Sequence, residues 1–547
     1  MPQSRRRPRA FAPGAFGFVR RSLVPLIVAA LSVGEAGAGV RRFEVRFEPG
    51  QITRAARPFV EGVAWSLPEC GVAGEAGAPA LPFRPLLLAV PEGERVVSVT
   101  ARASGATIEL DLGEPGVGLA DGRRDHTSWD GLSSWPAALS RTGPAGWMRG
   151  RQLQPVSIWP LSWDPARGVA RLTTAITLEM ITEPAATPPE VVRPMRPDSP
   201  GDRHFAELLE ARVLNPEDLG GHVVAARDLR PLDSGAAPFS PRFRPSVDGS
   251  PVEMVIITTD ALAPHFQPLA DWKTERGIPT VVRSIEWIRA NYPNAVDLGS
   301  TLRRFIADAV SRWGSQYVLL AGDAEIVPVR YGKTLYFGGE EIPADMYYQC
   351  VDGTWNSDGD AFFGEGYQSS TVTGDGCDLF PDVWLGRAAV SDSTDADTFV
   401  MKTMTYEKNP AAGYVTRGMI MAEVLFPQHY AQGDSIVYDG ATVAEQALAR
   451  FPAGFTLARY YENYLPYAGV GAMPEDKPSV VAAVNTGYGV IQHIGHGYVN
   501  TMAVGIGGQA LGNGDAAGFG NGPRYSLLYS INCTSAALDF NCIGEEW

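Results

Sequence analysis

The chain has 547 residues, 45% of them hydrophobic and 10% aromatic, with 60 glycines, 43 prolines and a formal net charge of −15. Length alone predicts several domains, and the apolar content is too high for a disordered protein. The many glycines and prolines exclude a coiled coil or an all-helical bundle. The acidic charge disfavours nucleic-acid and anionic-membrane partners, because lysine and arginine supply that affinity. It favours metal cations and cationic substrates.

The first 38 residues have the features of a signal peptide. Six arginines precede an apolar run from Leu23 to Val33, and Ala36-Gly37-Ala38 offers a cleavage site after Ala38. The run is about half of the ~20 residues that a membrane-spanning helix needs. We see no later stretch of spanning length, so we expect no transmembrane segment and a protein that is secreted or displayed at the cell surface.

Residues 39–183 form a predicted β-rich domain. Three segments alternate apolar and polar residues with the period of half-buried strands, namely Phe43–Phe47, Arg95–Val99 and Ala175–Met180. The region contains no lysine and no cluster of catalytic groups. Its predicted role is therefore structural or inhibitory.

Residues 184–250 are predicted to be a linker with little core of its own. Prolines recur, and apolar periodicity is confined to a short helical patch near Phe205–Leu209. Arg227, Arg230, Arg242 and Arg244 make this segment a plausible site of proteolytic cleavage.

From residue 251 onward, apolar strands alternate with helices, which predicts a mainly parallel sheet covered on both faces. The expected helices are Leu262–Thr274 and Leu302–Trp313. The expected strands are Val255–Ile257, Pro279–Val282, Tyr317–Ala321, Val383–Val390, Met419–Ala422, Gly489–Ile494 and Ser526–Ile531. In such sheets the ligand site lies beyond the carboxyl ends of the strands.

Two of these strands end in reactive side chains, His496 after Gly489–Ile494 and Cys533 after Ser526–Ile531. A cysteine with a histidine that is distant in sequence but adjacent in the fold is suited to acyl transfer. We expect Cys533 at a turn into a helical segment, where exposed amides would favour the thiolate. Gly495 and Gly497 would let backbone N–H groups approach a substrate carbonyl.

Two simpler interpretations compete with this one. An apolar-flanked cysteine is more often an inert core residue than a nucleophile. A zinc site using His493 and His496 is weaker, because residues three apart on a strand point to opposite faces and no further ligand motif accompanies them.

The motifs from residue 251 onward resemble those of the gingipain-like cysteine peptidases of the caspase-like clan. In order, they are Leu269–Lys273 with Arg276–Ile278, Tyr317–Asp323 with Ile326 and Pro328, Leu385–Arg387, Gly495–Gly497, Asn532-Cys533 and Cys542–Glu545. The resemblance implies a caspase-like α/β fold over residues 251–547 and an endopeptidase that forms an acyl-enzyme. It also implies that residues 39–183, with Gly77–Pro82 and Leu88–Pro91, are an inhibitory propeptide and that the protein is a zymogen.

The resemblance also implies roles for individual residues. Cys533 matches the nucleophile and His496 the catalytic histidine, while the amides of Gly497 and Cys533 match the oxyanion hole. Glu423 lies where family members place an acidic residue that assists the histidine. Asp434 matches the acidic floor of an S1 pocket that accepts a basic residue.

An acidic loop over residues 345–382 is a candidate calcium site. Asn356, Asp358 and Asp360 offer oxygen ligands at alternate positions, with Asp352 nearby, although the spacing departs from an EF-hand. A solvated acidic loop is the equal alternative, and structural calcium in the family favours the metal. Cys350 and Cys377 bracket part of the loop, and we expect them to form a disulfide.

The predicted function is thus an exported cysteine endopeptidase acting on protein or peptide substrates. Alternatives are a transpeptidase or sortase-like processing enzyme of the same fold, and a catalytically inactive secreted binding or adhesion protein. In the family the catalytic domain continues beyond the position of Trp547, so we expect this chain to be incomplete at its C-terminus.

Overall fold

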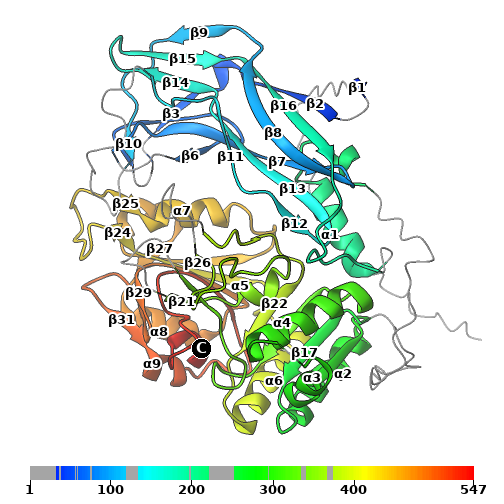
Figure 1. Ribbon diagram of the computed structural model, residues 1–547. Coiled ribbons are helices and arrows are strands. Elements are labelled where there is room, and N and C mark those ends of the chain that lie inside the picture. Colours follow the sequence, from blue (N-terminus) through cyan, green and yellow to red (C-terminus); the bar gives the residue numbers. More distant parts are fainter. Residues whose placement is uncertain are drawn as a thin grey trace, which may run out of the picture.

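The computed structural model describes residues 33–35, 38–55, 57, 60–73, 77–118, 134–195, 199–220, 252–293, 295–333, 341–365 and 374–547. Most of the predicted signal peptide and the four arginines of the predicted cleavage region lie outside these residues. None of the helices within these ranges is long and apolar enough to cross a membrane. The described chain forms a β-domain above an α/β half, with one helix between them (Figure 1).

The N-terminal β-domain contains the three strands that the alternating pattern predicts, and they are neighbours in one antiparallel sheet ordered β1-β2-β16-β8. Phe43 and Val45 of β2 pair with Leu178 and Ile176 of β16 and are buried with them on one face of the sheet, while the intervening residues are more exposed. The sheet comprises β1 (Val33–Glu35), β2 (Ala38–Arg46), β8 (Glu94–Ala103) and β16 (Ala175–Pro184).

The other strands of this domain lack a clear alternating pattern. A second sheet is ordered β11-β13-β7-β6, with β12 beside β13, and a third is ordered β14-β15-β9; two short pairs, β3–β5 and β4–β10, complete the domain. Their bounds are β3 Thr53–Ala55, β4 Val60–Glu61, β5 Ala64–Ser66, β6 Gly71–Ala73, β7 Leu81–Val90, β9 Thr107–Leu110, β10 Val117–Gly118, β11 Ser140–Thr142, β12 Gly146–Met148, β13 Arg151–Ile158, β14 Leu161–Asp164 and β15 Val169–Thr173.

Part of the predicted linker is folded, and the helical patch expected near Phe205–Leu209 is confirmed. Helix α1 (Pro200–Glu210) begins at the cap Ser199 and is followed by a 3₁₀ turn, η2 (Pro216–Asp218). Phe205 and Leu209 are fully buried in a core that also includes Met148 and Leu153 of the β-domain. Phe205 stacks on Trp384 of the α/β half at 5.3 Å, so this segment joins the two halves (Figure 1).

The α/β half contains two parallel sheets, where a single sheet was expected. The first is ordered β18-β17-β19-β22, and helices cover both faces. Phe305 of α4 and Ile288 of α3 pack on one face, and Phe266 of α2 and Val400 of α6 on the other. The strands are β17 (Met254–Thr258), β18 (Thr280–Ser284), β19 (Tyr317–Ala321) and β22 (Trp384–Ala388). The helices are α2 (Ala263–Glu275), α3 (Ile285–Asn291), α4 (Leu298–Asp308), the π-helical turn Ala309–Trp313 and α6 (Ser393–Lys408).

The second sheet is ordered β27-β26-β23-β28-β32 and is also parallel. Helix α7 covers one face and α8 the other. The strands are β23 (Arg417–Ala422), β26 (Thr456–Tyr461), β27 (Ala472–Pro474), β28 (Val490–Ile494) and β32 (Leu527–Ile531). The helices are α7 (Gly440–Leu448), the 3₁₀ segment η5 (Leu465–Val470), α8 (Lys477–Thr486), α9 (Asn513–Ala517) and α10 (Ile543–Glu546).

Short elements border the strand ends of both sheets. Beside the first sheet lie the hairpin β20 (Tyr331–Lys333) and β21 (Glu341–Pro343) and the helix α5 (Met346–Gln349). Beside the second sheet lie the pair β24 (Val424–Phe426) and β25 (Tyr438–Asp439) and the three strands β29 (Gly497–Tyr498), β30 (Thr501–Ala503) and β31 (Ala510–Gly512). These elements around the second sheet position the candidate site.

Candidate active site

His496 and Cys533 follow neighbouring parallel strands at equal offsets. Ile494 of β28 is the register partner of Ile531 of β32, and each reactive residue lies two positions further along. The Gly495 N–H donates to the Ile531 carbonyl at 3.1 Å, which continues the pairing beyond the strand ends. The structure therefore brings the predicted histidine and cysteine to the same edge of one sheet.

The ring of His496 is held by a backbone carbonyl. Its Nε2 lies 2.9 Å from the Leu425 carbonyl oxygen. Because a carbonyl can only accept, Nε2 carries the hydrogen and Nδ1 is left as the basic nitrogen of the neutral ring. Phe426 packs edge-on against the imidazole, with ring centroids 5.8 Å apart. These contacts fix both the tautomer and the orientation of the ring.

Glu423 supports the backbone of His496, with no hydrogen bond to its ring. One carboxylate oxygen accepts the His496 N–H at 2.5 Å, and the other accepts the Gly505 N–H at 3.3 Å. Burial raises the pKa of Glu423 to about 7, and the two N–H donors oppose that rise. Glu423 follows β23, whose residue Ala422 pairs with Ile494. The sequence therefore locates this glutamate correctly beside the histidine.

Cys533 is exposed and lies in an irregular segment that runs to residue 542. The expected turn into a helix is wrong, because α10 begins only at Ile543. The Cys533 backbone N–H makes no hydrogen bond with the described residues. The thiol and this amide are thus both accessible.

A polar clamp places this segment against Gly497. The Ser535 hydroxyl lies 3.1 Å and 2.9 Å from the carbonyls of Tyr498 and Thr501, and it accepts from the Asn532 amide at 2.8 Å. A Cβ atom at position 497 would lie 2.5 Å from the Ser535 Oγ atom. Glycine is therefore required at 497 for the close approach of the two segments.

His493 is a core residue, which excludes the zinc interpretation. Its Nδ1 pairs with the Ser530 hydroxyl and its Nε2 with the Ala503 carbonyl, both at 2.8 Å. Burial lowers the pKa of His493 to about 4. Both ring nitrogens are occupied, so this histidine is satisfied within the protein.

Asp434 lies in the exposed loop between β24 and β25. Its carboxylate accepts the Ala431 N–H at 3.0 Å. The same loop is anchored by Gln432, whose amide donates to the Glu462 carbonyl at 2.5 Å. Asp434 forms no hydrogen bond with Cys533 or His496, and its role in substrate binding stays a prediction.

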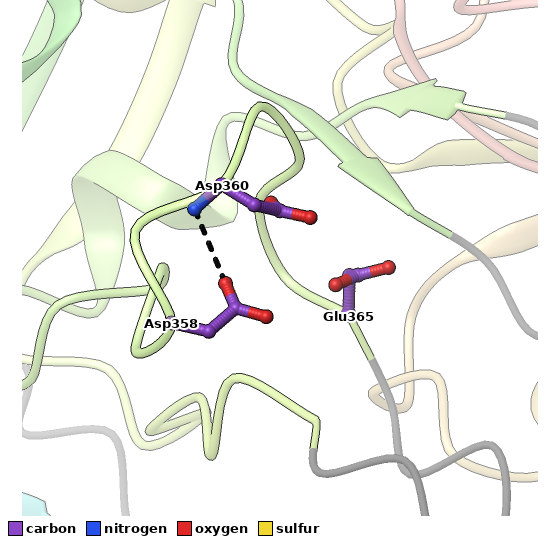
Figure 2. A group of neighbouring side chains, drawn as sticks. All are labelled: Asp358, Asp360 and Glu365. Atoms are coloured by element: carbon purple, nitrogen blue, oxygen red, sulfur yellow. Dashed lines mark hydrogen bonds between the residues drawn. The ribbon is translucent and has the colours of Figure 1, made fainter.

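The acidic loop brings together a group that overlaps the predicted calcium ligands only in part. Carboxylate oxygens of Asp358, Asp360 and Glu365 lie within 4.8 Å of one another (Figure 2). Asp352 is apart from this group, because its buried carboxylate accepts the Val192 N–H at 2.5 Å. The Asn356 Oδ1 atom accepts the Gly359 N–H at 2.7 Å. Asp358 and Asp360 of the predicted ligands thus lie in this group, whereas Asp352 does not, and Glu365 was not among the predicted ligands.

All five cysteines are free, so the expected disulfide between Cys350 and Cys377 is not formed. Cys350 is buried in the core of the first sheet, and Cys377 packs against that core. Burial raises the pKa of the Cys377 thiol to about 11. Both behave as small apolar residues.

Four further residues complete the site without a clear sequence signal. Leu425 acts through its carbonyl, and Ser535 acts through a clamp that requires the fold. Glu462 and Glu475 are buried behind Glu423. The sequence could have indicated the two glutamates by their position, because each directly follows a strand. The two strands, β26 and β27, were not predicted.

Comparisons with known proteins agree with this geometry. Residues 248–547 match the profile of "Peptidase family C25", which covers more than half of the chain. An uncharacterized protein of Archaeoglobus fulgidus is 22% identical over 304 residues, covering 52% of this chain and 66% of that protein. Gingipain R2 of Porphyromonas gingivalis is 19% identical over 310 residues, covering 56% of this chain and 35% of that protein. The chain therefore belongs to peptidase family C25, the gingipain-like cysteine peptidases.

Solved structures with some similarity come from the same family. One is a complex of the pro- and mature domains of RgpB from Porphyromonas gingivalis, with a TM-score of 0.38, 19% identity, and coverage of 54% of this chain and 59% of that one. Another is the Arg-specific cysteine proteinase gingipain R, with a TM-score of 0.38, 18% identity, and coverage of 54% and 58%. The family assignment rests on the sequence match. The chain spans only part of each of these relatives.

Proposed function

We propose that this protein is an exported cysteine endopeptidase in which Cys533 and His496 form the catalytic dyad. One observation carries the proposal: adjacent strands β28 and β32 deliver the two side chains to one edge, with the His496 Nε2 atom committed to Leu425. The Nδ1 atom is then the nitrogen available to take the proton of the thiol. Family membership supports the same reaction class.

In the proposed mechanism, the Cys533 thiolate attacks the scissile carbonyl and forms a tetrahedral intermediate. The unbonded N–H of Cys533 and that of Gly497 stabilise the oxyanion. His496 then gives a proton to the leaving amine, and water hydrolyses the acyl-enzyme with His496 as general base. Glu423 acts by holding the His496 backbone, which keeps the imidazole over the reaction site.

Substrates of this enzyme are proposed to carry a basic residue at the position before the cleaved bond. Asp434 lies in the exposed loop that follows Leu425 and Phe426, both of which contact His496. An exposed carboxylate near the site would attract such a cation, as would the acidic surface of the chain.

The N-terminal domain is proposed to be a propeptide that inhibits the enzyme until the chain is cut within residues 221–250. Its docking supports a stable association: Asp382 accepts the Arg149 N–H at 2.6 Å, and Asp378 accepts the Trp147 N–H at 2.5 Å. Arg151 makes a buried two-point ion pair with Asp202 of α1, at 2.9 and 3.0 Å. Removal of residues before Ser246 should raise activity if latency is correct.

Calcium is proposed to bind Asp358, Asp360 and Glu365 as a structural ion. Carboxylate oxygens are the ligands that this hard cation prefers. The pKa of Glu365 is raised by partial desolvation and by its acidic neighbours, Asp360, Asp375 and Asp358, as expected for carboxylates gathered without a counter-ion. Figure 2 shows the three side chains extending from one loop.

A peptidase assay tests the proposal. The full chain, cut by limited proteolysis within residues 221–250, should hydrolyse peptides with arginine or lysine before the cleaved bond. Cys533→Ala should abolish the activity, Cys70→Ala should leave it unchanged as the matched cysteine control, and Asp434→Asn should raise KM for basic substrates. Hydrolysis that survives Cys533→Ala would refute the dyad.

A further inference from the structure

Three glutamates lie buried behind the catalytic histidine, and each is the first residue after a strand. Glu423 follows β23, Glu462 follows β26 and Glu475 follows β27, which are consecutive strands of the second sheet. The register pairs Ala422 with Tyr461 and Tyr461 with Pro474, so the glutamates leave the sheet side by side. Their exposed fractions are 6%, 3% and 0%.

Gly505, in the turn after β30, closes this compartment. Its N–H donates to Glu423, and its φ is +57°, in the left-handed region that favours glycine. A Cβ atom there would lie 2.7 Å from the Glu462 Cβ atom and 3.0 Å from the Glu475 Oε2 atom. The three side chains therefore converge on a single residue.

Hydrogen bonding is unequal among the three carboxyl groups. Glu423 accepts two backbone N–H groups, and Glu462 accepts the Val424 N–H at 2.9 Å. Neither oxygen of Glu475 has a hydrogen-bond partner. The Glu462 N–H acts to lower the pKa of Glu475, but it donates its hydrogen bond to the Ala422 carbonyl at 3.0 Å. Glu475 is thus the least compensated group in the compartment.

Among the described residues, the positive charge that acts on this compartment is that of His496 when it is protonated. No lysine or arginine among the described residues forms an ion pair with any of the three glutamates. The ionisable groups that face them are Asp439 of β25 and His496, both acting on Glu462. Three carboxylates cannot all stay ionised in a buried site with so few donors. Burial raises the pKa of all three, and that of Glu475 rises well above its ordinary value.

We propose that Glu462 and Glu475 are positioning residues for His496, with Glu475 holding a proton so that, of the three carboxyl groups, Glu423 is the first to ionise. The inference rests on the proposed dyad. Glu423 can then hold the His496 N–H as a charged acceptor, which is stronger than a neutral one. Glu462 acts through the Val424 N–H, which fixes the segment whose Leu425 carbonyl orients the ring.

The pH dependence of kcat tests this inference in the cleaved full chain. Glu475→Gln retains a neutral donor, so its acid limb should move less than that of Glu475→Leu. Glu475→Leu removes the donor, so Glu423 should protonate more readily and the acid limb should move up by on the order of one pH unit. Glu462→Gln removes a like charge and should move the limb down, with KM unchanged in each variant. Glu253→Gln, just before strand β17 of the first sheet, is the matched control. It should change neither the position of the acid limb nor KM.

A second measurement is independent of catalysis. The infrared spectrum of the full chain at neutral pH should contain carbonyl bands of buried protonated carboxyl groups, including that of Asp352, whose pKa burial raises to about 9. In an Asp352→Asn background, Glu475→Gln should remove one further band. The absence of that band, or an acid limb that Glu462→Gln leaves in place, would overturn the inference. If Glu475→Leu does not fold, the infrared band and the acid limb of Glu462→Gln still test the inference. If the band is present but no variant cleaves peptide, the dyad proposal has failed while the proton on Glu475 stands.

Discussion

Asp345 beside the first sheet and the three glutamates behind the second sheet differ in how their charge is compensated. Beside the first sheet, Asp345 pairs with Arg387 at 2.6 and 2.7 Å, and that arginine also donates to the carbonyls of Gly322 and Val327. Behind the second sheet, Glu423 and Glu462 accept hydrogen bonds from backbone N–H groups, and Glu475 has no hydrogen-bond partner. A paired charge serves stability, whereas uncompensated charge costs stability and is typical of functional sites. Because burial also raises the pKa of Asp352, Asp378 and Asp382 beside the first sheet, the proposed chemistry at the second sheet rests on the placement of His496 and Cys533.

The largest expected effect is on catalysis. Replacement of His496 by alanine should lower kcat/KM by on the order of 10³–10⁴, because it removes the base that activates the thiol. The matched control is His265→Ala on α2, whose histidine pairs with Asp397 at the surface beside the first sheet. Initial rates on one peptide substrate measure both. Equal losses in the two variants would end the functional distinction between the sheets.

A stability measurement tests the first sheet. Arg387→Ala should reduce the free energy of unfolding by about 3–5 kcal/mol, because it leaves the partly buried Asp345 carboxylate without its partner. Lys408→Ala removes a more exposed ion pair with Glu275 and should cost less than about 1 kcal/mol. Denaturant titration compares the two variants. A loss under 1 kcal/mol for Arg387→Ala would contradict the structural role of that pair.

The buried glutamates behind the second sheet should make the stability of the protein depend on pH in an unusual direction. Burial raises the pKa of Glu423 and of Glu462 to about 7, above the ordinary value of 4.5. The folded state then keeps protons that the unfolded state has lost, so the free energy of unfolding should fall as pH rises from about 5 to about 8. Asp382 adds to this trend, since burial raises its pKa to about 7 as well.

Denaturant midpoints across that pH range measure the effect. The Glu423→Gln/Glu462→Gln double variant should show a shallower decline than the wild type, whereas Glu217→Gln, an exposed glutamate of η2, should not change it. A double variant with the wild-type slope would mean that these two carboxyls ionise normally in the folded protein.

The smallest expected effect concerns the acidic loop beside the first sheet. Added calcium should raise the melting temperature of the full chain by a few degrees, since a ligand at about 100 times its Kd stabilises by about 2.7 kcal/mol. Asp358→Asn/Asp360→Asn should abolish the rise, with Asp352→Asn as the comparison that separates the observed ligand group from the predicted one. A rise that survives the double substitution would place calcium elsewhere.

Much of this arrangement could be predicted from the sequence, and the reasons for the failures are physical. Strands such as Tyr317–Ala321 are fully apolar, so their bounds and the positions of His496 and Cys533 at strand ends could be read directly. Whether the strands form one sheet or two depends on pairing, which periodicity does not encode. The helix around Phe205–Leu209 could be predicted, but its packing could not, because its core comes from both halves of the chain. Leu425 acts through a backbone carbonyl, which every residue has.

The most direct test of the central claim is the labelling of the full chain, cleaved within residues 221–250, by a peptidyl electrophile with a basic residue at its reactive end. Mass spectrometry of the digested protein should find one equivalent of label on the peptide containing Cys533. The label should be strongly reduced in His496→Ala and unaffected in His265→Ala. Label distributed over the other cysteines, or no dependence on His496, would contradict the assignment of the dyad.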